Sequence, residues 1–424
     1  MTAARFLYTL LWFVALPFIA LRLVWRALRQ PGYRRHAGER FGWYDVAPKR
    51  RVIWIHTVSV GETRAAQPLV EALLARYAEA QVLMTYMTPT GRETGEILFG
   101  ERVLHAYLPY DYPAAVARFL DHFRPRVGLI METEIWFNLL AGCAARRIPA
   151  LLVNGRLSEK SAAGYQRIAG LARSALQSLA AVTAQSEADA GRFRLLGAER
   201  VLLCGSLKFD ITPDPALVAQ GRAWRAALPA WRQVLAVTNT REGEEALLLE
   251  AFCAAAEERR ARVLLVVVPR HPQRFNDVAA LVARSRLKLA RRSLNQLPSA
   301  DTQVWLGDSM GEMAAYYAMC DVALVGGSLL PFGGHNLIEA CAQGKPVLIG
   351  PHTFNFAEAT ELAIARDAAL RVADATRAME KAFELLDDTV AFRRRSEAAS
   401  RFAAEHRGAT EKTMALIAPL LDGK

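Results

Sequence analysis

The sequence predicts an α/β protein with two doubly wound domains that follow an N-terminal apolar helix. Its 424 residues fit two domains of roughly 200 residues each. From Val52 onward, short β-branched runs alternate with Ala-, Leu- and Arg-rich stretches of helical period, which predicts βαβ units and parallel sheets. A Pro-rich interval near residues 206–232 separates two sets of such runs. We therefore expect a membrane anchor at residues 1–30, a first domain at 31–212 and a second domain at 213–424.

Composition and charge exclude several classes of protein. Hydrophobic residues make up 52% and charged residues 22%, which excludes a disordered or collagen-like chain. Residues 1–51 carry ten Lys and Arg against two acidic residues, so they hold +8 of the net charge of +11. The rest of the chain is close to neutral, and we expect no nucleic-acid partner.

Residues 6–21 form an uncharged apolar stretch between Arg5 and Arg22, and they predict a membrane anchor. Sixteen helical residues extend about 24 Å, less than the roughly 30 Å hydrocarbon core of a bilayer. Two arrangements are open: a thin transmembrane span with snorkelling arginines, or a monotopic helix lying in the membrane interface. The cations mainly follow the stretch and no A-x-A site comes after it, which disfavours a cleaved signal peptide. The positive-inside rule places the body of the protein in the cytoplasm.

The apolar runs predict the strands in chain order. The first set lies at 52–55, 82–87, 103–108, 127–131, 150–154, 180–184 and 201–205. The second set lies at 234–238, 263–268, 287–290, 304–306, 322–327 and 346–350. Ligands of doubly wound folds bind beyond the carboxyl ends of the strands, so candidate site residues are expected just after each run.

Three charged motifs follow strands of the first half. SVGE follows the first strand and puts Glu62 at the start of a helix, where it acts either as a capping charge or as a general base. METE follows the fourth strand, with Glu132 and Glu134 on opposite sides of an extended chain. One of them faces the ligand, or both belong to a solvated strand end. GSLKFD follows the seventh strand, and its Lys208 is either a surface charge or a residue beside the interdomain hinge.

Two motifs of the second half suit an anionic ligand. Arg270 and His271 follow a hydrophobic strand and lie between two prolines, and a rigidly held cation suits a phosphate or carboxylate. GDSMGEM places Met310, Gly311 and Glu312 after another strand, where a helix can begin with free backbone N–H groups.

The most informative motif is GGSLLPFGGHNLIEA at residues 326–340. Its four glycines allow close backbone approach, a helix N-terminus near Asn336 can receive an anion, and Glu339 is placed to accept ribose hydroxyls. The alternative is a glycine-rich turn that only packs. G-x-G-x-x-G and P-loop motifs are absent, and the five scattered cysteines and missing H-E-x-x-H or D-x-D motifs give no reason to expect a metal.

SVGE, PRHP-x-RF, GD-x-MGE and GGSLLPFGGHNLIEA, in this order behind an apolar stretch, resemble the 3-deoxy-D-manno-octulosonic acid (Kdo) transferases of lipopolysaccharide synthesis. The resemblance covers nearly the whole chain and implies a GT-B fold, in which two Rossmann-like domains face a cleft. It implies transfer of Kdo from CMP-Kdo to a lipid A precursor, with inversion at the anomeric carbon and without a metal or other cofactor. The implied place is the cytoplasmic face of the inner membrane, in contact with membrane lipids.

The resemblance also implies residue roles. Glu62 matches the catalytic base of the family, and Glu132 and Lys208 match positions that support the transition state. Ser309 replaces an expected threonine, which puts little in doubt because both are small hydroxyl residues. The positions that contact CMP fall on Arg270, His271, Met310, Gly311, Glu312, Asn336, Leu337, Ile338 and Glu339.

Three other functions are open. A GT-B glycosyltransferase that uses a UDP-sugar would need more phosphate contacts than these motifs supply. A non-hydrolysing sugar epimerase shares the architecture, but the apolar anchor argues against it. A non-catalytic nucleotide-binding membrane protein leaves Glu62 unexplained.

Because no proposed site residue precedes Glu62, we expect loss of residues 1–21 to leave turnover on dispersed acceptor intact.

Overall fold

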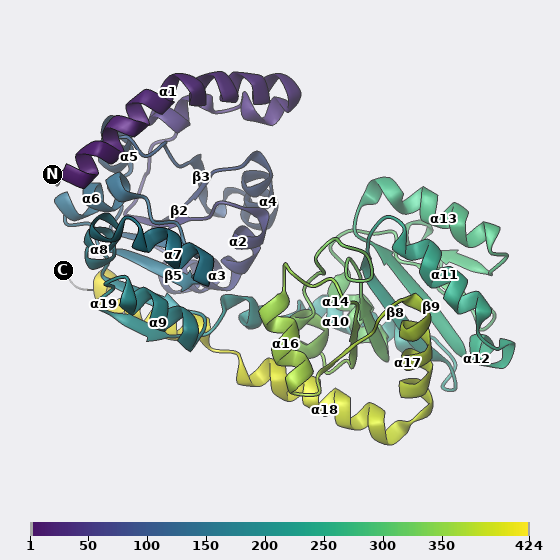
Figure 1. Ribbon diagram of the computed structural model, residues 1–424. Coiled ribbons are helices and arrows are strands. Elements are labelled where there is room, and N and C mark those ends of the chain that lie inside the picture. The colour runs from purple at the N-terminus through teal and green to yellow at the C-terminus, as the bar shows by residue number, and fades with distance from the viewer. Residues whose placement is uncertain (1–2, 423–424) are drawn as a thin grey trace. The chain divides into compact units, whose positions relative to one another are not determined.

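The computed structural model describes residues 3–422, which form two compact units (Figure 1). Unit 1 consists of Met1–Ile211 and His406–Lys424, and unit 2 of Thr212–Glu405. The chain first leaves unit 1 where the Pro-rich interval predicts a domain boundary. Each unit contains one seven-stranded sheet of parallel strands, so the predicted class of two doubly wound α/β domains is confirmed.

The sheet of unit 1 has the strand order β3-β2-β1-β4-β5-β6-β7. The order reverses between β1 and β4, which makes their carboxyl ends the expected ligand position of this sheet. All seven strands coincide with runs predicted from the sequence. They are β1 (Val52–His56), β2 (Gln81–Tyr86), β3 (Leu104–Tyr107), β4 (Val127–Met131), β5 (Ala150–Gly155), β6 (Ala181–Ala184) and β7 (Val201–Leu203).

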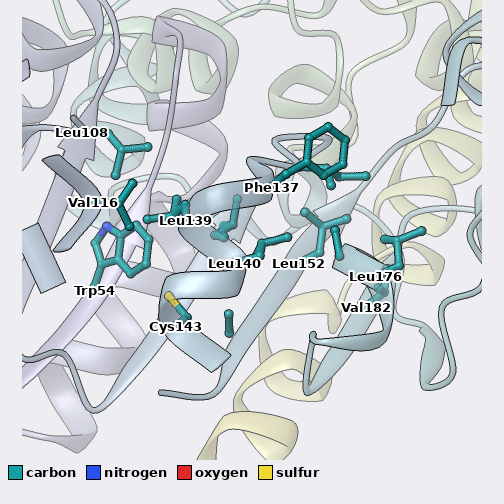
Figure 2. Packing of buried hydrophobic residues seen from close by; sticks show 14 of the residues in the cluster. Trp54, Leu108, Val116, Phe137, Leu139, Leu140, Cys143, Leu152, Leu176 and Val182 are labelled. Carbon is teal, nitrogen blue, oxygen red and sulfur yellow. The ribbon is translucent and has the colours of Figure 1, made fainter. Parts of the chain in front are cut away.

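Helices cover both faces of this sheet because successive residues of the strands point to opposite sides. In β1, Val52 and Trp54 belong to one buried cluster, whereas Ile53 and Ile55 belong to another. Figure 2 shows part of the first cluster, to which Trp54 and side chains of α6 such as Leu139 contribute. The covering helices are α2 (Val60–Ala65), α3 (Gln67–Arg76), α4 (Pro89–Phe99), α5 (Pro113–Phe123), α6 (Phe137–Ala145), α7 (Glu159–Gln166), α8 (Ala169–Gln177) and α9 (Glu187–Leu195).

The N-terminal apolar stretch forms the helix α1 (Ala3–Arg29), which contacts α6 and α8 of unit 1. The helix has 27 residues and continues past the predicted stretch through Arg22 and Arg26. Within the part of the chain that the structure describes, α1 is the one helix long and apolar enough to cross a membrane. The helical nature of the predicted anchor is therefore confirmed.

The C-terminal helix corrects the predicted extent of the second domain, which we expected to run to residue 424. Helix α19 (Ala409–Asp422) returns to unit 1 and packs on α3 and on the short helix η4 (Leu207–Asp210). The carboxylate of Asp210 accepts hydrogen bonds from the backbone N–H groups of Gly408 and Thr410. The apolar face of α19 is buried in the core of unit 1. The amphipathic pattern of a helix predicts that one of its faces packs against protein. The pattern does not show which domain that face packs against.

The sheet of unit 2 has the strand order β10-β11-β9-β8-β12-β13-β14 and reverses between β8 and β12. Six strands match predicted runs, and the seventh, β14, was missed because its three residues form no apolar run. The strands are β8 (Gln233–Thr240), β9 (Val263–Pro269), β10 (Leu289–Arg291), β11 (Val304–Leu306), β12 (Val322–Val325), β13 (Val347–Ile349) and β14 (Ala369–Arg371). The helices are α10 (Pro215–Ala226), α11 (Glu244–Ala254), α12 (Glu257–Arg262), α13 (Phe275–Arg284), α14 (Met313–Met319), α15 (Ile338–Ala342), α16 (Ala357–Ala365), α17 (Ala375–Asp387) and α18 (Thr389–Glu405).

Candidate active site

In unit 1 the predicted carboxylates lie at the position where the strand order reverses. Glu62 follows β1, and Glu132 follows β4, the strand that pairs with β1. Because the strands are parallel, both residues lie at the edge where the strands end, which we call the carboxyl edge. The fold therefore brings together two residues that are 70 positions apart in the sequence.

Glu62 is a buried residue (9% exposed) in the first turn of α2. Ser59 caps this helix by accepting a hydrogen bond from the Glu62 N–H. In return, Glu62 Oε1 accepts from Ser59 Oγ at 2.8 Å and Oε2 accepts from the Val58 N–H at 2.8 Å. The capping role that the sequence left open is thus present, and it fixes the carboxylate without using all of its lone pairs. A general base held in this way remains able to accept a proton.

The surroundings make Glu62 more basic than an exposed glutamate. Burial raises the pKa of Glu62, the hydrogen bonds from Val58 and Ser59 oppose the rise, and the negative charge of Glu132 adds to it. A carboxylate whose pKa moves toward neutrality is a stronger proton acceptor at physiological pH.

Glu132 ends β4 in the left-handed backbone region, with φ of +56°. A non-glycine residue there costs about 1 kcal/mol or more, and here the Glu132 N–H still donates to the Val153 carbonyl at 2.9 Å. Its carboxylate pairs with Lys208, with 3.7 Å between Oε1 and Nζ. Both side chains are half-buried, with 24% of each exposed, so the pair is reachable from solvent. Lys208 therefore lies beside the carboxylates, as its predicted role requires.

The turn that carries Lys208 is held from two directions. Asn154, which is buried near the end of β5, accepts a hydrogen bond from the Leu207 N–H at 3.0 Å. Asp210 at the end of the same turn binds the N-terminus of α19. The returning C-terminal helix thus helps to fix Lys208, which the sequence did not indicate.

Glu134 belongs to the same group of carboxylates, although only Glu132 of the METE motif was selected as a site residue. Burial and the negative charge of Glu62 raise the pKa of Glu134 to about 7, while the Trp136 side chain opposes the rise. Glu134 is therefore close enough to Glu62 for their charges to interact. The METE motif contained this signal, but spacing alone did not show which glutamate faces Glu62.

In unit 2 all the predicted donor-binding segments meet at one carboxyl edge. Arg270 and His271 follow β9, the Met310 segment follows β11, and the glycine-rich loop follows β12. Together with β8 these are four neighbouring strands, in the order β11-β9-β8-β12. The shared edge explains how motifs separated by some 70 residues contribute to one site.

Several arginines gather at this edge. Burial and the charges of Arg270 and Arg241 lower the pKa of His335 to about 4, so this imidazole is neutral at pH 7. The pKa of His271 is also lowered, by burial and by Arg241, Arg270 and Arg274. Three arginines thus act electrostatically on His271, and such a group of cations suits a phosphate or carboxylate.

The sequence reasoning missed Arg241 and Arg274, and two buried glutamates explain their placement. Glu244 accepts hydrogen bonds from the backbone N–H groups of Arg241, Gly327 and Leu329, so it ties the end of β8 to the glycine-rich loop. Glu245 pairs with Arg274, with 3.1 Å between Oε2 and Nη2. The signal was the run TREGEE at the end of β8, which ordinary helix capping also explains.

The glycine-rich loop has the conformation that its composition predicts. Gly327 has φ of +66°, and a Cβ there would meet the His335 ring at 2.8 Å. Asn336 accepts a hydrogen bond from the Ile338 N–H at 3.0 Å and donates one to Glu339 at 3.2 Å. Leu337 and Ile338 are buried, so any ligand contact they make is through the backbone.

The segment at residues 310–312 is exposed to solvent at Met310, whereas its Glu312 side chain is held by an ion pair. Met310 is 55% exposed, and a Cβ on Gly311 would meet no atom within 4 Å. The Glu312 carboxylate instead pairs with Arg292 through two hydrogen bonds of 2.8 and 3.0 Å. Although burial opposes it, hydrogen bonds from Arg292 and Ser309 lower the pKa of Glu312, so it carries its charge. The structure thus gives the Glu312 side chain a partner within the protein.

Among residues 3–422, no three His, Cys, Asp or Glu side chains are grouped so that they could hold a metal ion. Metal-independent chemistry remains a prediction of the sequence. The ligand roles of the individual residues likewise remain predictions, as does the cleft between the domains.

Comparisons with known proteins identify the family. Residues 35–211 match the family model described as 3-Deoxy-D-manno-octulosonic-acid transferase (kdotransferase). A 3-deoxy-D-manno-octulosonic acid transferase of Bordetella pertussis is 45% identical over 97% of this chain and 98% of its own. One of Haemophilus influenzae is 36% identical over 99% of both chains.

A structural comparison supports the fold independently. The UDP-GlcNAc 2-epimerase of Neisseria meningitidis matches 87% of this chain and 99% of its own, with a TM-score of 0.57 and 14% identity. At that identity the likeness shows the two-domain GT-B architecture alone. The sequence matches over the full length show that this chain belongs to the 3-deoxy-D-manno-octulosonic acid transferase family of glycosyltransferases.

Proposed function

We propose that this enzyme transfers Kdo from CMP-Kdo to a lipid A precursor with inversion at the anomeric carbon, and that Glu62 is the general base. Membership of the Kdo transferase family is the reason to propose Kdo as the transferred sugar. The observation that carries the mechanism is the buried Glu62 carboxylate, which is fixed by Ser59 and Val58 beside Glu132 and Glu134.

The donor is proposed to bind at the carboxyl edge of unit 2. CMP-Kdo carries one phosphate and one sugar carboxylate, and the arginines that act on His335 and His271 are proposed to pair with these anions. Arg270 is the proposed phosphate ligand because it directly follows β9 and is held by the Thr240 carbonyl through its N–H at 3.0 Å. Backbone groups of residues 336–338 and the Glu339 carboxylate are proposed to bind the nucleoside.

The reaction is a displacement at the anomeric carbon. A hydroxyl of the lipid acceptor gives its proton to Glu62 as its oxygen bonds to the anomeric carbon. The bond from that carbon to the phosphate oxygen breaks, and CMP leaves with the bonding electrons. Arg270 stabilises the negative charge that grows on the phosphate. Transfer requires the sugar held by unit 2 to reach Glu62 of unit 1.

Lys208 and Glu132 are proposed to support the transition state as a pair. Lys208 offsets negative charge near the reacting centre, and Glu132 holds Lys208 in place through their ion pair. The body of the enzyme is proposed to lie on the cytoplasmic side of the inner membrane, because the cations concentrate just after the apolar helix. A tether of this kind confines enzyme and lipid acceptor to one surface.

The test is incubation of the full chain with CMP-Kdo and a lipid A precursor, followed by mass spectrometry of the lipid and measurement of CMP release. A mass increase that corresponds to added Kdo, with matching CMP release, is expected. Product formed from a UDP-sugar in place of CMP-Kdo indicates a different glycosyltransferase. Saturable CMP binding without turnover on any lipid acceptor indicates a binding protein.

A further inference from the structure

Two side-chain hydrogen bonds attach the N-terminal half of α1 to the interior of unit 1. The Tyr8 hydroxyl donates to Asp111 Oδ2 at 2.8 Å, and Thr9 Oγ1 donates to Asn138 Oδ1 at 3.1 Å. Asp111 is 1% exposed and also accepts the N–H groups of Asn138 and Leu139 at 3.0 and 2.7 Å. Through Asp111, α1 is therefore bonded to the first turn of α6.

Aromatic contacts extend this attachment along the helix. The Tyr8 ring lies 5.0 Å from the Phe137 ring in an edge-to-face arrangement. Trp12 contacts both Tyr110 and Trp136, with ring centroids 6.2 and 6.3 Å away. These partners belong to the domain itself, because Tyr110 follows β3 and Trp136 immediately precedes α6.

The C-terminal end of α1 also contacts the body that follows it. Arg26 Nη1 donates to the hydroxyl of Tyr33 at 3.1 Å, and Tyr33 is buried. The guanidinium of Arg40, itself buried, lies 5.6 Å from the Tyr33 ring. Tyr8 and Arg26 are 18 residues apart, about 27 Å along a helix, which is nearly the thickness of a hydrocarbon core. Figure 1 shows α1 running along unit 1.

The two faces of α1 differ throughout. The less exposed positions recur every three to four residues, at 5, 8, 9, 12, 15, 16, 19, 20, 23, 26 and 27. The large apolar side chains of the other face are each 47–71% exposed. They are Phe6, Leu7, Leu10, Leu11, Phe13, Val14, Phe18, Leu21, Val24, Trp25 and Leu28.

These contacts conflict with a helix that crosses the bilayer. A crossing α1 would carry the loop at residues 110–112 and the exposed parts of α6 with it to the depth of the hydrocarbon. Polar groups and non-helical backbone are unfavourable there unless protein shields them. A helix that lies flat keeps its attached face on unit 1 and places only its apolar face in lipid.

We propose that α1 lies in the plane of the membrane interface, with its exposed apolar face in the lipid and its other face bonded to unit 1. The occupant of that face is a lipid bilayer with anionic headgroups, because the exposed cations Arg22, Arg29, Arg34 and Arg35 lie along and just beyond the helix. The same contacts set the orientation of unit 1. Residues 110–112 and 136–138 adjoin the carboxyl edge that holds Glu132 and Glu134, so this edge lies next to the membrane. That a lipid acceptor reaches the site through this orientation rests on the proposed function. The position of α1 in the membrane does not depend on it.

The test measures the depth of single cysteines on the exposed face of the full chain. Leu7, Val14, Leu21 and Leu28 are seven residues apart, are all exposed, and share one side of the helix. Each is replaced in turn by Cys in a Cys253→Ser background, because Cys253 is the one incompletely buried native cysteine among residues 3–422. The cysteines are labelled with a fluorophore, and the protein is bound to vesicles of phosphatidylcholine and phosphatidylglycerol that carry quenchers at known depths. Ala20→Cys, on the less exposed face, is the matched control.

A helix in the interface gives the same shallow depth at all four positions and much weaker quenching at Ala20→Cys. A crossing helix changes depth by about 10 Å from each position to the next. That stepwise result overturns the proposal. Absence of quenching at all four positions also overturns it, because the face is then covered by something other than lipid, such as a second copy.

A second measurement uses Ala4→Cys and a membrane-impermeant maleimide. The protein is added to preformed vesicles from outside, and labelling is compared before and after detergent. We expect full reaction before detergent, and protection until detergent is added would overturn the proposal. Neither measurement depends on Kdo transfer, so failure here is distinguishable from failure of the proposed function.

Discussion

Replacement of Glu62 by Gln is expected to abolish transfer while leaving CMP binding unchanged. The amide removes the proton acceptor but keeps the size of the side chain. Loss of a general base typically lowers the rate 10²- to 10⁴-fold, about 2.7–5.5 kcal/mol in activation free energy. The cations that are proposed to bind CMP lie in unit 2, so the Kd for CMP should stay within about twofold of the wild type.

The structure shows a side effect of this substitution that must be separated from the loss of the base. Glu62 accepts one hydrogen bond at each oxygen, from Ser59 and from Val58. Gln keeps one accepting oxygen and turns an amide donor toward the other donor, at a cost of about 1–3 kcal/mol in stability. Ser59→Ala is the matched control, because it removes the N-cap at about 0.5–2 kcal/mol but leaves the carboxylate and its bond to Val58.

The assay is CMP release with CMP-Kdo and a dispersed lipid A precursor, alongside calorimetric CMP binding and thermal unfolding of both variants. We expect Ser59→Ala to retain a rate within several-fold of the wild type and Glu62→Gln to fall at least 100-fold. A Glu62→Gln rate within about threefold of the wild type would remove Glu62 from the role of base. An equal loss in Ser59→Ala would show that the start of α2, and not the missing base, limits the rate.

Three further outcomes are expected. Arg270→Ala should raise the Kd for CMP roughly 10- to 100-fold, since a charge-assisted hydrogen bond contributes about 1.5–3 kcal/mol, and an unchanged Kd in calorimetry would dismiss it as a phosphate ligand. Glu132→Gln should move the acid limb of the pH profile of kcat/KM to lower pH. The negative charge of Glu132 adds to the raised pKa of Glu62, which acts only when deprotonated, so an unmoved limb would contradict the coupling of the two carboxylates. Activity should persist in excess EDTA, and strict dependence on added magnesium would contradict the metal-free mechanism.

Much of the fold follows from local sequence pattern because a buried parallel strand is an uninterrupted apolar run. Val263–Pro269 is an example, with all seven residues buried. Features that depend on partners distant in sequence could not be predicted from local sequence pattern. Helix α19 is held by Asp210, some 200 residues earlier, and the left-handed backbone of Glu132 is supported from the neighbouring strand.

The candidate site shows the same division between local and distant information. Motifs located Glu62, Arg270 and the glycine-rich loop, because loops after strands carry the ligand contacts in these folds. Arg241 was missed, and Glu134 was named but not chosen over Glu132, because the importance of both residues comes from neighbours on other strands. Arg241 lowers the pKa of His335 across the point where the strand order of the second sheet reverses. Glu62 raises the pKa of Glu134 across the corresponding point of the first sheet.

The anchor and the carboxylate group are parts of one structure in unit 1. Trp12 of α1 contacts Trp136, and Trp136 in turn influences the protonation of Glu134, the neighbour of Glu62. Removal of α1 would take the Tyr8 hydroxyl from buried Asp111 and uncover Trp136 and Phe137 at the start of α6. The sequence suggested that residues 1–21 are a tether without effect on turnover, since no site residue precedes Glu62. The contacts of Trp12 and Tyr8 give α1 a second role, because they support the segment between β4 and α6 on which Glu132 and Glu134 are carried.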